Sequence, residues 1–526
     1  MANDAFGAQR MGLAAAMLSV GILLSRLLGY VREAVIAYQQ GAGAATDAYN
    51  AAFLLPDLMN YFLAGGTLSI TFIPIFGAFL AQGREDEGWR LFSIIGTTMG
   101  LFLTAGIVVA EIFAESLVRW LFPGFGPESV ALTVEMTRVV LPAQLFHYIG
   151  GLMLATLMAQ GRFLAATFAP LVYNAGIIVF GLLLGPVMGM KAFAVGALVG
   201  AIAGPFGLSL YQARGIVRFR PLLSLSDPGF RRYLWLSVPL MLGVSLTTVD
   251  EWLGRILGSS MEEGSISWLN YGRRLMLVPI AVIGQAAGQA ALPFLSRLAG
   301  EGKREELALL LSKTLRVVLL LALVATGVTL VLAEPLVVAV YERGAFAAGD
   351  TARTAVILRL FALGIGAWGV QMVAVRAFYA EQNTWTPMLL SSGITVLSVP
   401  VYLVLGARWG VYGLAGAASA GMVAQSLAVL WFYGRSNRAF PWRNLLEGLW
   451  RGLLLAAVAS LGASLGLLLP FDLGRSTGAF VALLVGGGGA ALALVLAAPR
   501  IAPQEWTRLS GMVSSRLGRY GRRKKT

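Results

Sequence analysis

The hydrophobic positions of this chain fall into long runs separated by short polar connections. A helix needs about 20 apolar residues to cross a hydrocarbon core of about 30 Å, and about fourteen runs reach that length. The expected spans are 11–38, 48–80, 91–118, 131–159, 163–186, 191–213, 232–258, 266–297, 306–333, 352–380, 386–407, 409–434, 447–470 and 477–498. The pattern predicts an all-α, polytopic membrane protein with about 14 transmembrane helices.

Composition supports this prediction and excludes several kinds of chemistry. Of 526 residues, 57% are hydrophobic and 13% are charged, whereas a soluble domain has about 25% charged residues. The chain has no Cys and a single His, His147, so disulfides, a thiol nucleophile and a His/Cys metal cluster are excluded. We therefore expect a protein that is not an enzyme.

The net charge of +14 is better explained by topology than by nucleic-acid binding. Recognition of nucleic acid needs a basic face on a soluble domain, but here the basic residues lie mostly in short connections, such as 84–90, 214–232, 297–304 and 435–451, and in the C-terminal tail. Because positive connections favour the cytoplasmic side, we expect a membrane protein with both termini in the cytoplasm and no nucleic-acid partner.

Weak internal similarity relates the two halves of the chain. The matching positions, about 219 to 222 residues apart, are Pro74 and Pro293, Phe125 and Phe346, and Gln160 and Gln382. Six spans separate the equivalents, so the halves have parallel topology. We expect two six-helix lobes related by a pseudo-two-fold axis, with two extra C-terminal helices. Chance similarity of amphipathic loops is the alternative.

This repeat gives a domain organisation. The expected parts are an N-lobe at 1–213, a cytoplasmic linker at 214–231, a C-lobe at 232–440, two further helices in 441–500 and a basic cytoplasmic tail at 501–526. The linker is interpreted as a hinge or as a helix that lies on the membrane surface.

Two arginines, Arg26 and Arg32, lie near the middle of the first span. Fixed charge at a helix centre costs roughly 2.5–3.5 kcal/mol per arginine, so such residues usually face a bundle interior or a water-filled cavity. Guanidinium groups bind phosphate oxygens in pairs, which favours recognition of phosphate or pyrophosphate. The alternative is a structural ion pair between Glu33 and either arginine.

Further charges lie in the seventh and eighth spans. Asp250 could bind Na⁺ or carry a proton, or it or Glu251 could pair with Arg255 at helical spacing. Arg273 in the eighth span could face the same cavity as Arg26 or extend to the membrane interface.

Asp47, just before the second span, also has two interpretations. Beside Thr46 it resembles a helix cap, and the alternative is a gating residue that pairs across the lobes.

Several motifs resemble the MurJ (MviN) family of lipid II flippases, within the multidrug/oligosaccharidyl-lipid/polysaccharide exporter superfamily. The resemblance covers nearly the whole chain. Its motifs are Ser25-Arg26-x-Leu28-Gly29-x-x-Arg32-Glu33, Gly41-Ala42-Gly43-x-x-Thr46-Asp47-Ala48, Leu55-Pro56-Asp57-Leu58, Gly264-Ser265-Ile266-Ser267, Leu292-Pro293, Gly344-x-Phe346 and Ala377-Phe378-Tyr379.

The resemblance implies export of the undecaprenyl-pyrophosphate-linked peptidoglycan precursor from the inner to the outer leaflet by alternating access. With the residues above, it gives a set of expected roles. Substrate binding is expected at Arg26, Arg32, Asn60, Arg273 and Arg274, gating at Asp47 and Glu33, and an ion site at Asp250, Ser398 and Ser419.

The chain also departs from the family pattern, at Asn60, Tyr61, Gly65, Arg273 and Leu277, where well-studied members carry charges of other kinds. These departures leave the headgroup of the substrate open. The alternatives are a flippase for another polyprenyl-linked glycan, such as exopolysaccharide or O-antigen, and an ion-coupled exporter of amphiphiles.

No cofactor is expected, and the chain lacks a Walker motif. Coupling to Na⁺ or H⁺ stays open. Moving anionic charge outward gains roughly 2.3 kcal/mol per charge per 100 mV, so the membrane potential could drive transport. The expected partners are the lipid-linked glycan and membrane lipids, with the monomer as the functional unit.

Overall fold

The computed structural model describes residues 2–63, 71–242, 246–468, 474–507 and 510, and these residues form helices and connecting turns without a strand. Gly65 and most of the predicted basic tail lie outside the described residues. The predicted all-α class is confirmed. The chain divides into two compact units: Met1–Val244, Glu251–Ser267 and Arg343–Phe346 form the first, and Ser245–Asp250, Trp268–Glu342 and Ala347–Thr526 form the second.

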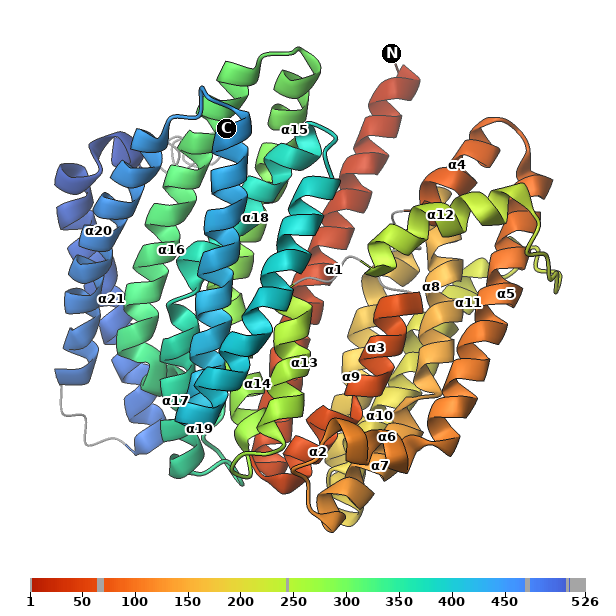
Figure 1. Cartoon of the computed structure of the whole chain (residues 1–526), viewed down its shortest axis with the longest axis horizontal. Coiled ribbons are helices and arrows are strands. Elements are labelled where there is room, and N and C mark those ends of the chain that lie inside the picture. Colours follow the sequence, from red (N-terminus) through yellow and green to blue (C-terminus); the bar gives the residue numbers. More distant parts are fainter. Residues whose placement is uncertain (1, 64–70, 243–245, 469–473, 508–509, 511–526) are drawn as a thin grey trace, which may run out of the picture. The chain divides into compact units, whose positions relative to one another are not determined.

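The first unit holds the N-terminal helices, which run from red to yellow-green in Figure 1. They are α1 (Ala2–Gln40), α2 (Ala44–Ala52), α3 (Leu54–Leu63), α4 (Ile73–Ala81), α5 (Glu85–Ile112), α6 (Ala114–Leu121), α7 (Pro127–Val140), α8 (Ala143–Ala159), α9 (Leu164–Met188), α10 (Lys191–Ala201), η2 (Ile202–Leu208), α11 (Ser209–Ala213) and α12 (Pro228–Leu242). Residues 217–227 are not helical, so the interpretation of this segment as a surface-lying helix is wrong.

The helices α13 (Leu246–Gly258) and α14 (Ser265–Ile280) each contribute residues to both units. The remaining helices belong to the second unit. They are η3 (Ala281–Gln285), α15 (Ala286–Gly300), α16 (Arg304–Val340), α17 (Ala348–Ala362), α18 (Ile365–Ala380), α19 (Trp385–Ser436), α20 (Trp442–Leu468) and α21 (Arg475–Ile501). The lobe boundaries at 213 and 232 stay predictions.

Among the described residues, nine helices are long and apolar enough to cross a membrane, or ten if the bent pair α17 and α18 forms one span. One of them, α19, contains 52 residues and is interrupted at Gly410, whose φ of 57° and ψ of −139° are not helical. It therefore covers two predicted spans. Shorter helices, α2–α4 and α12–α13, occupy two more. The predicted count of fourteen is consistent with this arrangement.

Turn geometry recurs in the two halves at nearly constant spacing. Left-handed backbone conformations occur at Gly83 and Gly302, at Gly161 and Gln382, and at Gly189 and Gly410, which are 219, 221 and 221 residues apart. The values of φ in the last pair are 58° and 57°. Such conformations favour glycine, so their recurrence at the offsets of the sequence matches supports an internal repeat.

Each unit has its own apolar core. In the first, aromatic side chains at Phe72, Phe76, Trp89 and Phe92 are buried between α4, α5 and α8. In the second, the core lies between α15, α16, α18 and the end of α19. The two helices outside the repeat, α20 and α21, pack closely against each other. A Cβ added at Gly462 would lie only 2.4 Å from the carbonyl oxygen of Gly489, so this contact has room for glycine alone. Small residues at such positions let the backbones of two helices approach each other.

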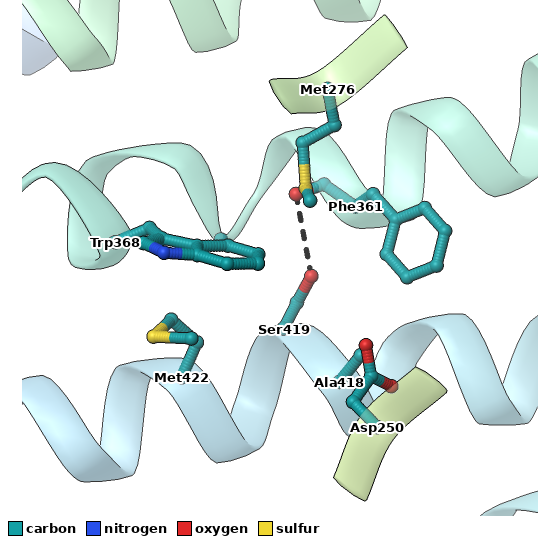
Figure 2. A pocket seen from close by; sticks show the side chains of 8 residues that line it. Asp250, Met276, Phe361, Trp368, Ala418, Ser419 and Met422 are labelled. Carbon is teal, nitrogen blue, oxygen red and sulfur yellow. Dashed lines mark hydrogen bonds between the residues drawn. The ribbon is translucent and has the colours of Figure 1, made fainter. Parts of the chain in front are cut away.

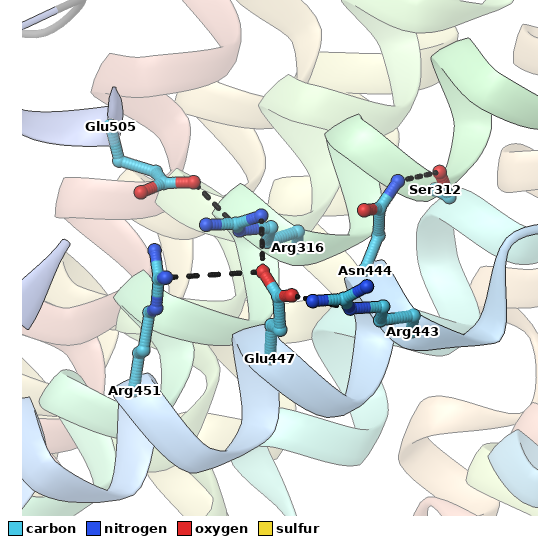
Figure 3. Close-up of polar contacts among 7 residues, drawn as sticks. All are labelled: Ser312, Arg316, Arg443, Asn444, Glu447, Arg451 and Glu505. Atoms are coloured by element: carbon cyan, nitrogen blue, oxygen red, sulfur yellow. Dashed lines mark hydrogen bonds and ion pairs between the residues drawn. The ribbon is translucent and has the colours of Figure 1, made fainter. Parts of the chain in front are cut away.

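A buried ion network also holds these two helices to α16. Arg316 on α16 lies 2.7 Å from Glu505, which follows α21, and 3.2 Å from Glu447 on α20. Figure 3 shows Arg316 between the two carboxylates, with Arg443 and Arg451 beside Glu447. A buried arginine needs such partners, so the segment after α21 helps to fix α20 and α21 on the second unit.

Candidate functional site

Asp47 on α2 is the most completely bonded of the predicted gating residues. Its carboxylate accepts hydrogen bonds from the backbone N–H of Gly264 at 2.7 Å, and from the N–H and hydroxyl of Ser267 at 2.8 and 2.6 Å. Asp47 is 3% exposed. The helix begins at Ala44 without a side-chain cap, so the interpretation of Asp47 as a helix cap is wrong. The carboxylate instead holds the turn that leads into α14.

A second contact joins α3 to α13. The guanidinium of Arg255 donates to the carboxylate of Asp57 at 2.6 Å, and Tyr61 packs edge-on against Trp252 with ring centroids 5.5 Å apart. Arg255 thus has a partner on another helix, which the helical spacing to Asp250 or Glu251 could not indicate. Asn60, a predicted substrate ligand, is exposed on α3.

The two arginines of α1 have different environments. Arg32 donates to Glu33 at 2.7 Å and to the side-chain oxygen of Asn174 on α9 at 3.1 Å. Glu33 is buried, at 4% exposure, so the predicted structural pair is formed by Arg32. Arg26, six residues earlier, is exposed near the centre of α1. Of the two side chains, that of Arg26 is the more exposed.

The second unit contains a buried ion pair between Asp250 and Arg273. From the sequence alone, Asp250 is assigned to an ion site and Arg273 to substrate binding. The carboxylate of Asp250 lies 2.7 Å from the guanidinium of Arg273, and both side chains are less than a tenth exposed. Tyr402 on α19 donates its hydroxyl to the same carboxylate at 2.6 Å. Arg273 also lies over the ring of Phe361, 5.4 Å from its centroid. Arg274, the next residue, is half-buried on α14.

Of the three predicted ion-site residues, Asp250 and Ser419 line a small pocket and Ser398 does not. Figure 2 shows Asp250 and Ser419 at this pocket with the apolar side chains of Met276, Phe361 and Trp368. Ser419 donates to the carbonyl of Leu360 at 2.7 Å, and Ser398 donates within its own helix. Within the described ranges, no group of three or more His, Cys, Asp or Glu side chains could hold a metal ion. The cation beside Asp250 in this structure is Arg273.

Two glycines to which the sequence analysis assigned no role make tight contacts at turns of the first unit. Gly344 has a φ of 62°, and a Cβ there would lie 2.2 Å from the carbonyl oxygen of Tyr38. Gly124, 220 residues earlier, lies equally close to Ser260, where a Cβ would be 2.3 Å from the Cα. The end of α1 and the end of α13 therefore meet repeat-related turns, and the motif Gly344-x-Phe346 was the available signal.

Comparisons with known proteins agree on one family. A family model described as lipid II flippase MurJ matches residues 36–483. The lipid II flippase MurJ of Burkholderia cenocepacia is 30% identical over 400 residues, covering 74% of this chain and 77% of the relative. The probable lipid II flippase MurJ of Rhizobium tropici is 28% identical over 453 residues, covering 82% and 83%.

Solved structures share the fold. A lipid II flippase MurJ in an inward closed conformation has a TM-score of 0.77 at 21% identity and covers 92% of this chain and 99% of that chain. A multidrug resistance MATE transporter in an inward-facing conformation has a TM-score of 0.66 at 16% identity, covering 81% and 98%.

Proposed function

This chain belongs to the lipid II flippase MurJ family, and we propose that it moves the lipid-linked peptidoglycan precursor from the inner to the outer leaflet of the bacterial inner membrane by alternating access. The headgroup of such a lipid is too polar to cross hydrocarbon alone, whereas its polyprenyl tail is stable there. A multi-pass helical protein with a charged residue in a membrane-spanning helix can bind the headgroup while the tail stays in the lipid. The observation that carries the proposal is the exposed charge of Arg26 at the centre of α1.

In this proposal Arg26 binds the pyrophosphate of the substrate. Arg32 contributes positive charge one and a half turns later but is partly neutralised by Glu33, so its role is to support α1 against Asn174 on α9. Arg274, half-buried on α14, is the proposed second contact to the phosphates. Arginine suits this role because its planar fork binds two phosphate oxygens at once.

Gating is proposed for the contacts of Asp47. Its three accepted hydrogen bonds tie α2 to the turn before α14, and the packing of Gly344 on Tyr38 closes the same part of the first unit. Alternating access requires that these contacts break and form once in each cycle.

Complementation tests the function. Expression of this chain is expected to restore growth and cell shape to a bacterial strain depleted of its own lipid II flippase, while the empty vector does not. Failure to restore growth by a chain that is present in the membrane would overturn the proposal. Restoration of glycan export in a strain that lacks an exopolysaccharide or O-antigen flippase would then assign the other polyprenyl-linked substrate.

For the energy source, we propose the membrane potential acting on the anionic substrate, with the monomer as the transporting unit. We propose that Arg273 is the permanent counter-ion of Asp250. Its guanidinium supplies the positive charge that a coupling cation such as Na⁺ would otherwise supply. A guanidinium keeps its charge at all physiological pH values, so Asp250 is neutralised without Na⁺.

Substitution within this pair should be strongly non-additive. Arg273→Gln leaves a buried carboxylate without its counter-ion, and breaking a buried pair in this way costs about 3–5 kcal/mol. The double variant Asp250→Asn with Arg273→Gln removes both charges and is expected to recover most of that loss. Thermal unfolding of the purified protein measures both, and replacing Na⁺ by K⁺ should not shift the midpoint of the unsubstituted chain.

The exposed pair of Arg84 and Glu87 provides the matched control. These side chains are 50% and 53% exposed, so Arg84→Gln should leave the midpoint of thermal unfolding nearly unchanged, because exposed ion pairs contribute little to stability. A double variant at Asp250 and Arg273 that is as unstable as Arg273→Gln alone would contradict the proposed pairing.

A further inference from the structure

The segment between α11 and α12 follows the side of α5 instead of leaving the protein. Arg218 donates to Asp86 at 3.0 Å, the backbone N–H of Arg220 donates to the hydroxyl of Ser93 at 3.1 Å, and that of Leu222 donates to the hydroxyl of Thr97 at 3.2 Å. The contact on α5 thus moves by eleven residues, or roughly 16 Å along the helix axis.

The segment then returns. Asp227 lies 3.7 Å from Arg90, near the beginning of α5, and its carboxylate accepts hydrogen bonds from the N–H groups of Gly229 and Phe230 at the start of α12. Between Thr97 and Arg90 the contact moves back by roughly 10 Å. Residues 218–227 therefore form a loop that runs along α5 and back, with its tip near Leu222. We call it the α5 loop.

The α5 loop lies against a helix, α5, that is long and apolar enough to span a membrane, so part of the loop is expected to lie at membrane depth. Non-helical backbone at membrane depth is tolerated only where its polar groups have partners. The hydroxyls of Ser93 and Thr97 supply them at consecutive turns of α5. Phe219 packs edge-on against Phe92, and a Cβ at Gly96 would lie 3.4 Å from its ring. The loop is thus built onto the helix.

The tip and the flanks of the loop differ in character. Leu223 and Leu225 at the tip are 66% and 65% exposed, and the nearby Trp235 on α12 is 80% exposed. The flanks carry exposed arginines at 214, 218, 220, 231 and 232. Apolar side chains between basic ones, with an exposed tryptophan, are typical of a segment in the membrane interface.

We propose that the α5 loop is an anchor in the lipid, with Leu223 and Leu225 among the acyl chains and the flanking arginines bound to anionic phospholipid headgroups. The leaflet is the one on the side of the basic connections, which the positive-inside rule assigns to the cytoplasm. The same loop joins the last helix of the predicted N-lobe to α12, so anionic lipid would hold this connection against α5. The inference does not depend on which substrate is transported.

A fluorescent label tests the depth of the tip. The chain has no native cysteine, so Leu223→Cys gives a single labelling site for an environment-sensitive dye. The control is Glu305→Cys, at an exposed position in the first turn of α16. In phosphatidylcholine and phosphatidylglycerol vesicles, a nitroxide on the acyl chain should quench the dye at 223 and an aqueous quencher the dye at 305. Equal access of the aqueous quencher to both positions would overturn the proposal.

Charge removal tests the headgroup contact. Arg231→Gln with Arg232→Gln should weaken the preference for spin-labelled phosphatidylglycerol over phosphatidylcholine by roughly 30-fold, since each arginine near an anionic surface contributes about 1 kcal/mol. Arg435→Gln with Arg438→Gln makes the same charge change at exposed positions of another connection. It serves as the control and should leave unchanged the quenching of the dye at position 223 by spin-labelled phosphatidylglycerol. If both double variants reduced this quenching equally, a specific role for the α5 loop would be overturned.

Discussion

Arg26→Ala is expected to abolish support of cell-wall synthesis while the protein still inserts into the membrane. Arg26 is exposed at the middle of α1 and is the proposed ligand of the pyrophosphate. A hydrogen bond to a charged group contributes about 1.5–3 kcal/mol, which corresponds to a roughly 10- to 150-fold loss in affinity. Growth of a lipid II flippase depletion strain measures the effect, and the amount of protein in the membrane fraction shows that insertion is unchanged.

Two further variants serve as comparisons for Arg26→Ala. Arg26→Lys keeps the charge but loses the planar fork, so partial support of growth is expected. Arg162→Ala removes an equally exposed arginine from the turn between α8 and α9 and should support growth like the unsubstituted chain. Normal growth with Arg26→Ala would exclude Arg26 from substrate binding, and loss of growth with Arg162→Ala would point to a general effect of net charge.

Asp47→Ala is expected to loosen the contact between α2 and the turn before α14. The substitution removes the acceptor for the N–H groups of Gly264 and Ser267, and each buried donor left without a partner costs about 1–3 kcal/mol. Amide hydrogen exchange at these two residues should accelerate by about tenfold or more, because local opening becomes easier. Support of growth should fall in parallel, since a cycle that cannot hold one end closed does not transport.

Asp86→Asn provides the comparison for this variant. Asp86 is 92% exposed and pairs with Arg218 on the surface, so the substitution should leave exchange at Gly264 and Ser267 unchanged. Asp47→Asn keeps the size of the side chain and one carbonyl acceptor and should have an intermediate effect. Unchanged exchange at both amides in Asp47→Ala would show that the carboxylate does not hold the turn.

Much of the fold could be predicted because lipid imposes a simple rule on sequence. Each crossing needs a long apolar run, and the predicted runs coincide with helices such as α5, α9 and α16. The irregular crossings were less accessible to prediction. The second predicted span, 48–80, is interrupted at Phe53 between α2 and α3, and hydropathy cannot indicate this break because both helices lie in one apolar run.

The residues of the candidate site could be selected from the sequence, but their partners could not. Asp250 and Arg255 stood out because charge in an apolar segment is costly, whereas Asp47 and Asp57 stood out as parts of the family motifs. Spacing along one helix, however, identifies only neighbours three or four residues apart. The partner of Arg255 is 198 residues away and that of Asp47 is 217 residues away, and these distances are bridged only when helices pack.

The sequence by itself therefore determined that this chain crosses a membrane many times, that it belongs with a family of lipid II flippases, and that Arg26 and Arg32 place fixed charge within its first apolar run. Tertiary structure decided which of the charged side chains are buried and which are exposed. It gave Arg32 to Glu33 and Asn174, gave Arg273 to Asp250, and left Arg26 exposed. The physical reason is that the cost of a buried charge can be read from composition, whereas its compensation depends on groups that only the packing of distant helices brings within hydrogen-bonding distance.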